Sequence, residues 1–194
     1  MSEQVLDKLV CIYQFYDVKP GFGDSHALVE AVEFGWWYSA LLPGHRMVIA
    51  LMTDADLSRE YQFNDEAHWK AALVQTNRTR TRSHFCANPT ALSVRAAHSR
   101  ALDSVADKGW LAVGDAAAAF DPLSSAGIFK AMRGGTVAAY AIGDYLKGDD
   151  SATPKYQLLF DAEYKKYLDK RAEYYGQVRR FEGAKFWCRR QLTK

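Results

Sequence analysis

The stretch GWLAVGDAAAAFDPLSSAGIFKAMRGG, residues 109–135, is the part of the chain that best predicts its fold and a ligand site. Its apolar start, Trp110–Val113, predicts a short buried strand that ends abruptly at Gly114. Such a strand would hold Asp115 at a fixed point, where a carboxylate can accept hydrogen bonds from a sugar-like hydroxyl. Because glycine has no side chain, a ligand can approach the backbone closely at Gly114.

The second part of the stretch predicts a tight turn followed by a helix. The alanines at 116–119 leave little side-chain bulk beside the carboxylate, and Asp121-Pro122 favours a turn. Ser124 or Ser125 is expected to cap a helix that runs to about Leu146. The free amides and the dipole at that helix start form a site for negative charge.

This pattern resembles the second FAD-binding motif of the flavin monooxygenase superfamily, which contains aromatic hydroxylases, tryptophan halogenases and geranylgeranyl reductases. The resemblance implies that Asp115 bonds the ribityl chain of FAD and that Pro122 lies along the flavin edge. It also implies that the amides of Ser125–Ile128 face the flavin N1 and C2 carbonyl, where reduced flavin is anionic. The cofactor-binding residues implied in this way are Gly114, Asp115, Pro122, Ser124, Ser125, Ala126, Gly127 and Ile128.

A simpler interpretation of the same stretch is a strand, a turn and a helix whose small residues form only a packing seam. An isolated Gly-Asp pair would favour that interpretation. The combination of Gly-Asp-Ala-Ala, Asp-Pro and Ser-Ala-Gly at these spacings favours the flavin site instead.

An aromatic strand, Gly35–Pro43 (GWWYSALLP), resembles the substrate-domain strand of halogenases and their relatives. Successive strand residues point to opposite faces, so Trp36 and Tyr38 share one face and Trp37 lies on the other. One face is expected to be plain core, and either Trp37 or the pair Trp36 and Tyr38 faces substrate. The C-terminal Phe186–Arg190 also resembles the end of the halogenase-like branch.

The superfamily's first motif, G-x-G-x-x-G after an initial strand, is absent from the chain. Gly21-Phe22-Gly23 does not replace it, because the third glycine and a following helix are missing. We therefore expect a C-terminal part of an enzyme that lacks its N-terminal nucleotide-binding segment and binds FAD weakly or not at all by itself. The expected protein partners are that missing segment or a flavin reductase.

The halogenase pattern is also incomplete. Halogenases share a Trp-x-Trp-x-Ile-Pro strand, whereas this chain has Trp36-Trp37-Tyr38 and Leu42-Pro43. Tryptophan halogenases have a threonine before the glycine of the helix-opening loop, and Ala126 stands there without a hydroxyl. These departures favour hydroxylation over halogenation. Relatives that modify tryptophan in a partner protein share the Gly-Trp-Trp-Tyr sequence, so the substrate is expected to be an aromatic small molecule or a protein-borne aromatic residue.

The rest of the chain predicts an α+β fold. Short β-rich segments with tight turns predict an antiparallel sheet in the first part of the chain. A segment with helical spacing follows these strands, and the Gly-Asp strand and the C-terminal helices come after it. Strands are expected at 9–16, 27–34, 35–43, 46–53 and 93–99, helices at 65–75, 154–180 and 184–191, and a loop or edge at 78–82. We expect a substrate-domain-like region at 1–107 and the flavin motif with its C-terminal helices at 108–194.

Composition excludes several other classes. The three cysteines, Cys11, Cys86 and Cys188, lack the spacing of a disulfide framework or zinc ribbon and suit a cytoplasmic protein. No signal peptide or membrane span is visible. The five histidines lack metal-site spacing, so no metal is expected.

The C-terminal region, residues 155–194, carries 11 Lys or Arg against 5 Asp or Glu, a local charge of +6. With interleaved tyrosines this region could bind nucleic acid. A solvated helix face with charge pairs four residues apart is favoured, so no nucleic-acid partner is expected.

The expected function is that of an FAD-dependent oxidoreductase, a monooxygenase that hydroxylates an aromatic substrate through the flavin C4a-hydroperoxide. A flavin-dependent halogenase and a geranylgeranyl-reductase-like enzyme are the alternatives within the superfamily. A truncated, non-catalytic module that binds a ligand or a partner is the alternative of another class. No catalytic acid or base is assigned, because the cofactor carries the reaction.

Overall fold

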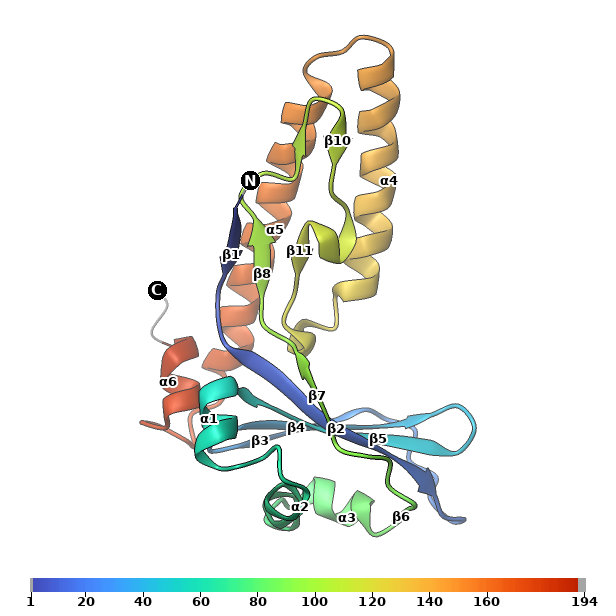
Figure 1. Cartoon of the computed structure of the whole chain (residues 1–194), viewed down its shortest axis with the longest axis vertical. Helices are drawn as coiled ribbons and strands as arrows, with labels where there is room; N and C mark the ends of the chain where they lie inside the picture. The colour runs from blue at the N-terminus through green and yellow to red at the C-terminus, as the bar shows by residue number, and fades with distance from the viewer. Residues whose placement is uncertain (1, 192–194) are drawn as a thin grey trace. The chain divides into compact units, whose positions relative to one another are not determined.

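The computed structural model describes residues 2–191, which form two compact units (Figure 1). The sheet unit comprises Lys8–Ala96 and the chain from Val178 onward, and the helical unit comprises the chain up to Asp7 and Ala97–Gln177. The predicted α+β class with antiparallel sheets is confirmed. The division of function at residues 107 and 108 stays a prediction.

The sheet unit contains a six-stranded antiparallel sheet in the order β3-β4-β5-β2-β6, with β7 also paired to β2. The four strands predicted between residues 9 and 53 are all present in this antiparallel sheet, but the meander expected from their tight spacing was wrong, because β2 pairs with β5 rather than with β3. The strands are β2 Leu9–Val18, β3 Leu28–Val32, β4 Gly35–Leu42, β5 Arg46–Asp54, β6 Cys86–Ala87 and β7 Ser93–Ala96. Gly35 has φ +156°, and a Cβ atom there would overlap the Met52 carbonyl, so the start of β4 requires glycine.

One face of this sheet packs against helix α2, Glu66–Val74, to form the hydrophobic core. Trp37 of β4 is fully buried there and meets the Trp69 ring edge to face, with ring centroids 5.0 Å apart. Asp65 caps α2 by accepting hydrogen bonds from the amides of Ala67 and His68. The helix predicted from the spacing of residues 65–75 is confirmed.

Two short helices flank α2, namely α1 Ala55–Glu60 and α3 Arg78–Ser83. The prediction of a loop or edge at 78–82 was wrong. The carboxylate of Glu30 on β3 accepts hydrogen bonds from the amides of Asn77, Arg78 and Thr79, at 2.7–3.1 Å, and from the Thr79 hydroxyl. A carboxylate at the first amides stabilises a helix, and here it comes from a distant strand.

The C-terminal helix α6, Lys185–Gln191, also belongs to the sheet unit. Arg190 and Asp54 form a buried ion pair at 2.5 Å, and Arg189 binds Asp54 at 2.8 Å. The Trp187 indole donates a hydrogen bond to the Val32 carbonyl. Part of the basic C-terminal region is therefore used for internal contacts.

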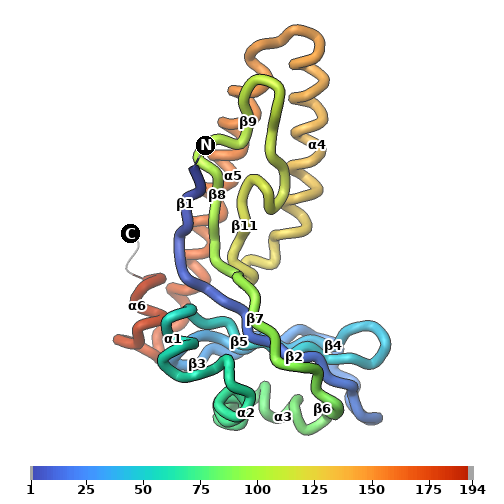
Figure 2. Tube along the Cα trace, viewed as in Figure 1, coloured from blue at the N-terminus to red at the C-terminus, as the bar shows by residue number. Residues whose placement is uncertain are grey.

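The helical unit holds a three-stranded antiparallel sheet, a two-stranded hairpin and two long helices. Its elements are β1 Glu3–Val5, β8 Arg100–Leu102, β9 Ala106–Asp107, β10 Trp110–Leu111, the 3-10 turn η1 Gly114–Ala116, β11 Ala118–Ala119, the 3-10 turn η2 Pro122–Ser124, α4 Gly127–Leu146 and α5 Ala152–Gly176. Figure 2 shows α4 and α5 side by side, joined by a short turn. Within residues 2–191, no helix has both the length and the apolar character that a membrane crossing needs.

The short strand before the Gly-Asp pair differs from the prediction. Only Trp110–Leu111 is strand, and the Trp110 side chain is exposed, because this segment pairs with β9 in a two-stranded hairpin alone. A two-stranded hairpin buries little on its own. The Tyr156 hydroxyl of α5 nevertheless fixes the following backbone by donating to the Ala112 carbonyl at 2.8 Å.

Candidate functional site

Asp115 lies on a sharp turn between the hairpin and the first turn of α4. Gly114 adopts the left-handed conformation, with φ +61°, and a Cβ atom there would lie 3.4 Å from the Ala131 Cβ. The glycine thus allows both the turn and a close approach to α4. The Asp115 side chain is 74% exposed, so its carboxylate is accessible to a ligand.

Lys130 is the cation beside this carboxylate. Its Nζ atom lies 2.9 Å from Asp115 Oδ1, donates to the Ala118 carbonyl and sits 4.4 Å from the centroid of the Phe120 ring. The lysine side chain is largely buried, whereas its carboxylate partner is exposed. Lys130 was not predicted from the sequence, where its position one turn into the predicted helix was the only available signal.

Asp121 points away from the solvent and fixes the loop that precedes α4. Its carboxylate is buried and accepts hydrogen bonds from the Leu123 amide at 3.0 Å, the Tyr175 hydroxyl at 2.7 Å and the Arg171 guanidinium at 3.3 Å. Burial raises the pKa of the Asp121 carboxyl, and these three donors oppose that effect. The geometry of the turn thus depends on Asp121, while Pro122 starts η2.

Arg171 and Tyr167 of α5 extend this buried network. Arg171 also binds Asp7 at 2.8 Å. The Tyr167 hydroxyl accepts the Asp121 amide at 2.8 Å and bonds Ser99 Oγ at 2.5 Å, and burial raises the pKa of Tyr167 to about 12. Helix α5 therefore fixes the loop before α4 through the hydrogen bonds of Tyr167 and Arg171.

The opening of α4 differs in detail from the prediction. Neither serine caps the helix: Ser125 adopts the left-handed conformation with φ +51°, and Ala126 occupies the N-cap position without a side-chain hydrogen bond. Ser124 Oγ instead accepts the Ala126 amide at 3.3 Å. The helix starts at Gly127 and ends at Leu146, as predicted for its end. Because no side chain covers the helix start, its first amides can meet an external acceptor.

The implied cofactor residues are thus brought together within the helical unit. Gly114 and Asp115 lie at η1, Pro122 and Ser124 lie in η2, Ser125 and Ala126 directly precede α4, and Gly127 and Ile128 are its first two residues. An exposed carboxylate, a left-handed glycine and an open helix start fit the ribityl hydroxyls and the anionic edge of a flavin. The assignment of each residue to FAD stays a prediction.

A pocket of about 260 Å³ lies between α4 and α5 beside Gly114. Phe120, Phe129, Phe160 and Tyr167 contribute aromatic rings to its wall, and Lys130 contributes a charge. Phe120 and Tyr167 stack with centroids 3.8 Å apart. Gly114 and Lys130 belong both to this pocket and to the candidate site, so the pocket is part of that site.

The aromatic strand β4 places its residues on two different faces. Trp37 belongs to the core, while Trp36 and Tyr38 lie on the opposite face, across from Met52 and Ala50 of β5. The register also brings Tyr13 of β2 opposite Ala50. A contact between Trp36 or Tyr38 and a substrate stays a prediction.

Known proteins supply the family context. No family model matches the chain. LodB of Marinomonas mediterranea, which is named as an FAD-dependent oxidoreductase, is 31% identical over 186 residues, covering 95% of this chain and 49% of LodB. The chain is therefore a homologue of LodB. It spans about half the length of this relative.

Solved flavoproteins share the fold. CmlS, a flavin-dependent halogenase, matches 99% of this chain and 37% of its own, with a TM-score of 0.87 and 19% identity. The myxobacterial chondrochloren halogenase CndH matches 98% of this chain and 46% of its own, with a TM-score of 0.83 and 18% identity. The match to the peptidyl tryptophan dihydroxylase QhpG covers 98% of this chain and 45% of QhpG, with a TM-score of 0.74 and 22% identity. The superfamily resemblance is confirmed, and the flavoprotein fold covers nearly the whole chain.

Proposed function

We propose that this chain forms the flavin-facing part of an FAD-dependent monooxygenase that acts on an aromatic substrate. The observation that carries the proposal is the accessible Asp115 carboxylate, placed by the left-handed Gly114 close to the uncapped start of α4. In the same proposal, residues 1–107 supply the substrate surface and residues 108–194 supply the flavin motif.

Each site residue then has a defined task. Asp115 accepts a hydrogen bond from a ribityl hydroxyl, for which its contact with Lys130 has to be shared or exchanged. The amides of Ser125–Ile128 meet the negative edge of the isoalloxazine ring. Asp121 holds the intervening turn in place through its contacts with α5. FAD itself supplies the redox chemistry when it is bound, and the protein binds, orients and shields it.

The aromatic face of the sheet supports an aromatic substrate. Tyr38 and Tyr13 are partly exposed on the sheet face opposite the core, and Ala50 leaves little bulk between them, whereas Trp36 is buried on the same face. Flat apolar rings suit such a surface. The likeness to the peptidyl tryptophan dihydroxylase QhpG favours a protein-borne aromatic residue as the substrate within this class.

A halogenase is the second candidate function, because CmlS and CndH match the fold over 98–99% of this chain. Ala126 has no hydroxyl at the helix-opening loop, which favours hydroxylation. Reduced flavin would come from a flavin reductase or from a bound electron donor. We further propose a cytoplasmic location, because Cys11, Cys86 and Cys188 are all free thiols.

The proposal is tested by FAD binding to the chain assembled with the complementary half of LodB, meaning the part of LodB that this chain does not match. Asp115→Ala should weaken FAD binding about 10-fold or more, because a hydrogen bond to a charged group is lost. Asp144→Ala, a matched acidic change on α4 whose side chain contacts Lys147 at 3.9 Å, should leave the affinity unchanged. An assembly that stays colourless and ignores added FAD would support the non-catalytic module instead.

If FAD binds, product analysis separates the two catalytic candidates. Turnover of an aromatic peptide or small molecule with oxygen should give a hydroxylated product whether or not bromide or chloride is present. A product that carries halogen, and forms only with halide, would select the halogenase.

A further inference from the structure

We propose that Lys130 is a positioning residue of the flavin site, which holds the Asp115 carboxylate in an ion pair and thereby favours binding of the anionic, reduced flavin. This inference rests on the proposed flavin function. Lys130 has no task in the proposed contacts with FAD, although its amine lies next to the residue that would bind the ribityl chain.

Lys130 lies at an unfavourable place for a cation. It is the fourth residue of α4, and its amide donates a hydrogen bond, at 2.8 Å, to the carbonyl of the N-cap residue Ala126. The first turn of a helix carries the positive end of the dipole, so a cation there is disfavoured unless an anion neutralises it. The position of Lys130 therefore requires an anionic partner.

The folded chain holds the lysine amine through three contacts. Lys130 Nζ lies 2.9 Å from Asp115 Oδ1, donates to the Ala118 carbonyl and lies 4.4 Å from the centroid of the Phe120 ring. Only 15% of the lysine side chain is exposed, whereas 74% of the Asp115 side chain is exposed. A ligand at this site would thus meet the carboxylate, and the lysine would act on that ligand through Asp115.

The ion pair leaves part of the carboxylate available to a ligand. Lys130 contacts Oδ1, and among residues 2–191 no group donates a hydrogen bond to Asp115 Oδ2. A ribityl hydroxyl can therefore donate to Oδ2 while Lys130 keeps Oδ1. The lysine also fixes the direction of the carboxylate, because its amine is itself anchored by the Ala118 carbonyl.

The neighbouring arginines pair with other carboxylates. Arg133 pairs with Glu163 at 3.0 Å, and Arg100 pairs with Glu3. Lys130 is therefore the cation that balances the carboxylate of the Gly-Asp turn. Without its charge, the turn would carry an unbalanced negative charge beside the proposed flavin site.

The charge balance affects the oxidation state of the flavin, because the reduced flavin is anionic at N1 and the C2 carbonyl. An unbalanced Asp115 would repel that negative charge, whereas the pair of Asp115 and Lys130 is neutral and keeps the hydrogen-bond acceptor. The amides at the start of α4 can then stabilise the reduced ring without an opposing charge nearby. Removal of the lysine charge should therefore weaken the binding of reduced FAD more than the binding of oxidised FAD.

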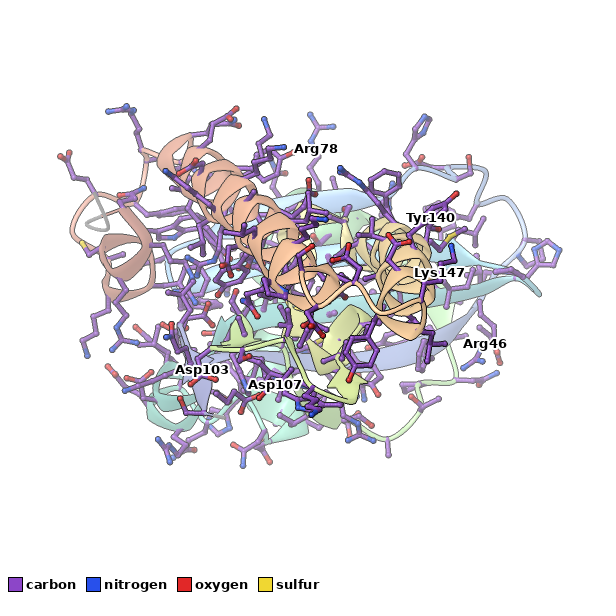
Figure 3. The ribbon with its side chains drawn as sticks, turned by 90° about the horizontal axis from the view of Figure 1, so that it is seen from above. Arg46, Arg78, Asp103, Asp107, Tyr140 and Lys147 are labelled. Carbon is purple, nitrogen blue, oxygen red and sulfur yellow. The ribbon has the colours of Figure 1, made fainter. Side chains whose placement is uncertain are left out.

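The first measurement is hydrogen exchange of this full chain without FAD, in Lys130→Met and in the control Lys147→Met. Lys147, labelled in Figure 3, follows the last residue of the same helix and pairs with Asp144 at 3.9 Å. In Lys130→Met the amides of residues 114–118 should exchange about 3-fold faster or more, and in the control they should not change. An unchanged exchange rate in Lys130→Met would overturn the positioning role.

The second measurement uses the same variants assembled with the complementary half of LodB. The dissociation constants of oxidised FAD and of dithionite-reduced FAD are determined without oxygen. Lys130→Met should weaken reduced FAD about 10-fold more than oxidised FAD, which corresponds to a fall of about 30 mV in the two-electron midpoint potential. Lys130→Arg keeps the charge and should restore most of the difference, and Lys147→Met should behave like the wild type.

A second substitution separates the charge of Lys130 from a purely structural contact. Asp115→Asn added to Lys130→Met removes the unbalanced charge, so the ratio of the two dissociation constants should return to within about 3-fold of the wild type. Equal weakening of both oxidation states by Lys130→Met, or no recovery in the double variant, would overturn the proposal. A wild-type assembly that binds FAD in neither oxidation state would refute the proposed flavin function, and the charge role of Lys130 with it.

Discussion

Removal of the Tyr175 hydroxyl should destabilise the helical unit by a predictable amount. Tyr175 is fully buried in α5, and its hydroxyl donates to Asp121 Oδ2 at 2.7 Å. The substitution Tyr175→Phe keeps the ring, including its position 5.1 Å from the Arg171 guanidinium, and deletes only the oxygen. The change therefore probes one hydrogen bond beneath the proposed flavin loop.

The magnitude follows from the burial and the charge of the acceptor. A hydrogen bond to a charged group contributes about 1.5–3 kcal/mol, and loss of one donor leaves part of the Asp121 carboxylate unsatisfied. The Leu123 amide and Arg171 remain as donors, so the carboxylate is not left without partners. We expect the free energy of unfolding to fall by about 2 kcal/mol.

Urea denaturation followed by far-ultraviolet circular dichroism measures this change. Tyr174→Phe is the matched control, because the Tyr174 ring packs 4.9 Å from Lys170 Nζ and this contact survives the substitution. The control should change stability by less than about 0.5 kcal/mol. In a double-mutant cycle, Tyr175→Phe in the Asp121→Asn background should cost about 1 kcal/mol less than in the wild type. Equal costs in the two backgrounds would refute the assignment of this hydrogen bond.

Two further predictions concern the sheet unit. Gly35→Ala should lower the free energy of unfolding by roughly 3 kcal/mol or more in a urea melt, because the new Cβ atom overlaps the Met52 carbonyl; an unchanged midpoint would contradict the geometry of β4. Arg189→Met should cost about 1 kcal/mol near neutral pH, since its hydrogen bond and charge lower the pKa of the partly exposed Asp56 carboxyl to about 2. A depressed carboxyl pKa adds stability above the ordinary value near pH 4, so the difference between wild type and variant should shrink as pH falls from about 4 towards 2. A difference that persists at pH 2 would assign the effect to packing instead.

The sheet was predictable because its signals are local. Alternating and β-rich segments marked β2, β3, β4 and β5, and the structure moves their ends by two residues at most. Helix α3 was missed because its stabilising cap is Glu30, a residue 47 positions from the first amide that it binds. The three-residue strands β1 and β8 pair residues about 100 positions apart, which no local pattern reveals.

The turn and the helix of the candidate site could be predicted from the sequence, whereas the backbone conformation of Ser125 and the contact of Lys130 could not. The Gly114-Asp115 turn and the end of α4 at Leu146 follow from glycine and helix signals. The left-handed Ser125 does not, because its conformation is imposed by the turn that Asp121 holds through Tyr175 and Arg171. Lys130 was missed for a similar reason, since only folding brings its amine to the carboxylate.

Hydrogen exchange at the start of α4 measures whether its first amides contact FAD. The chain assembled with the complementary half of LodB would be compared with and without FAD, and exchange followed by mass spectrometry in peptides that cover 125–128. FAD should slow exchange of these amides by about 10-fold or more, while exchange in peptides from α2 should be unchanged. If FAD binds the assembly and the amides of 125–128 exchange at the same rate as before, the start of α4 is not part of the flavin site.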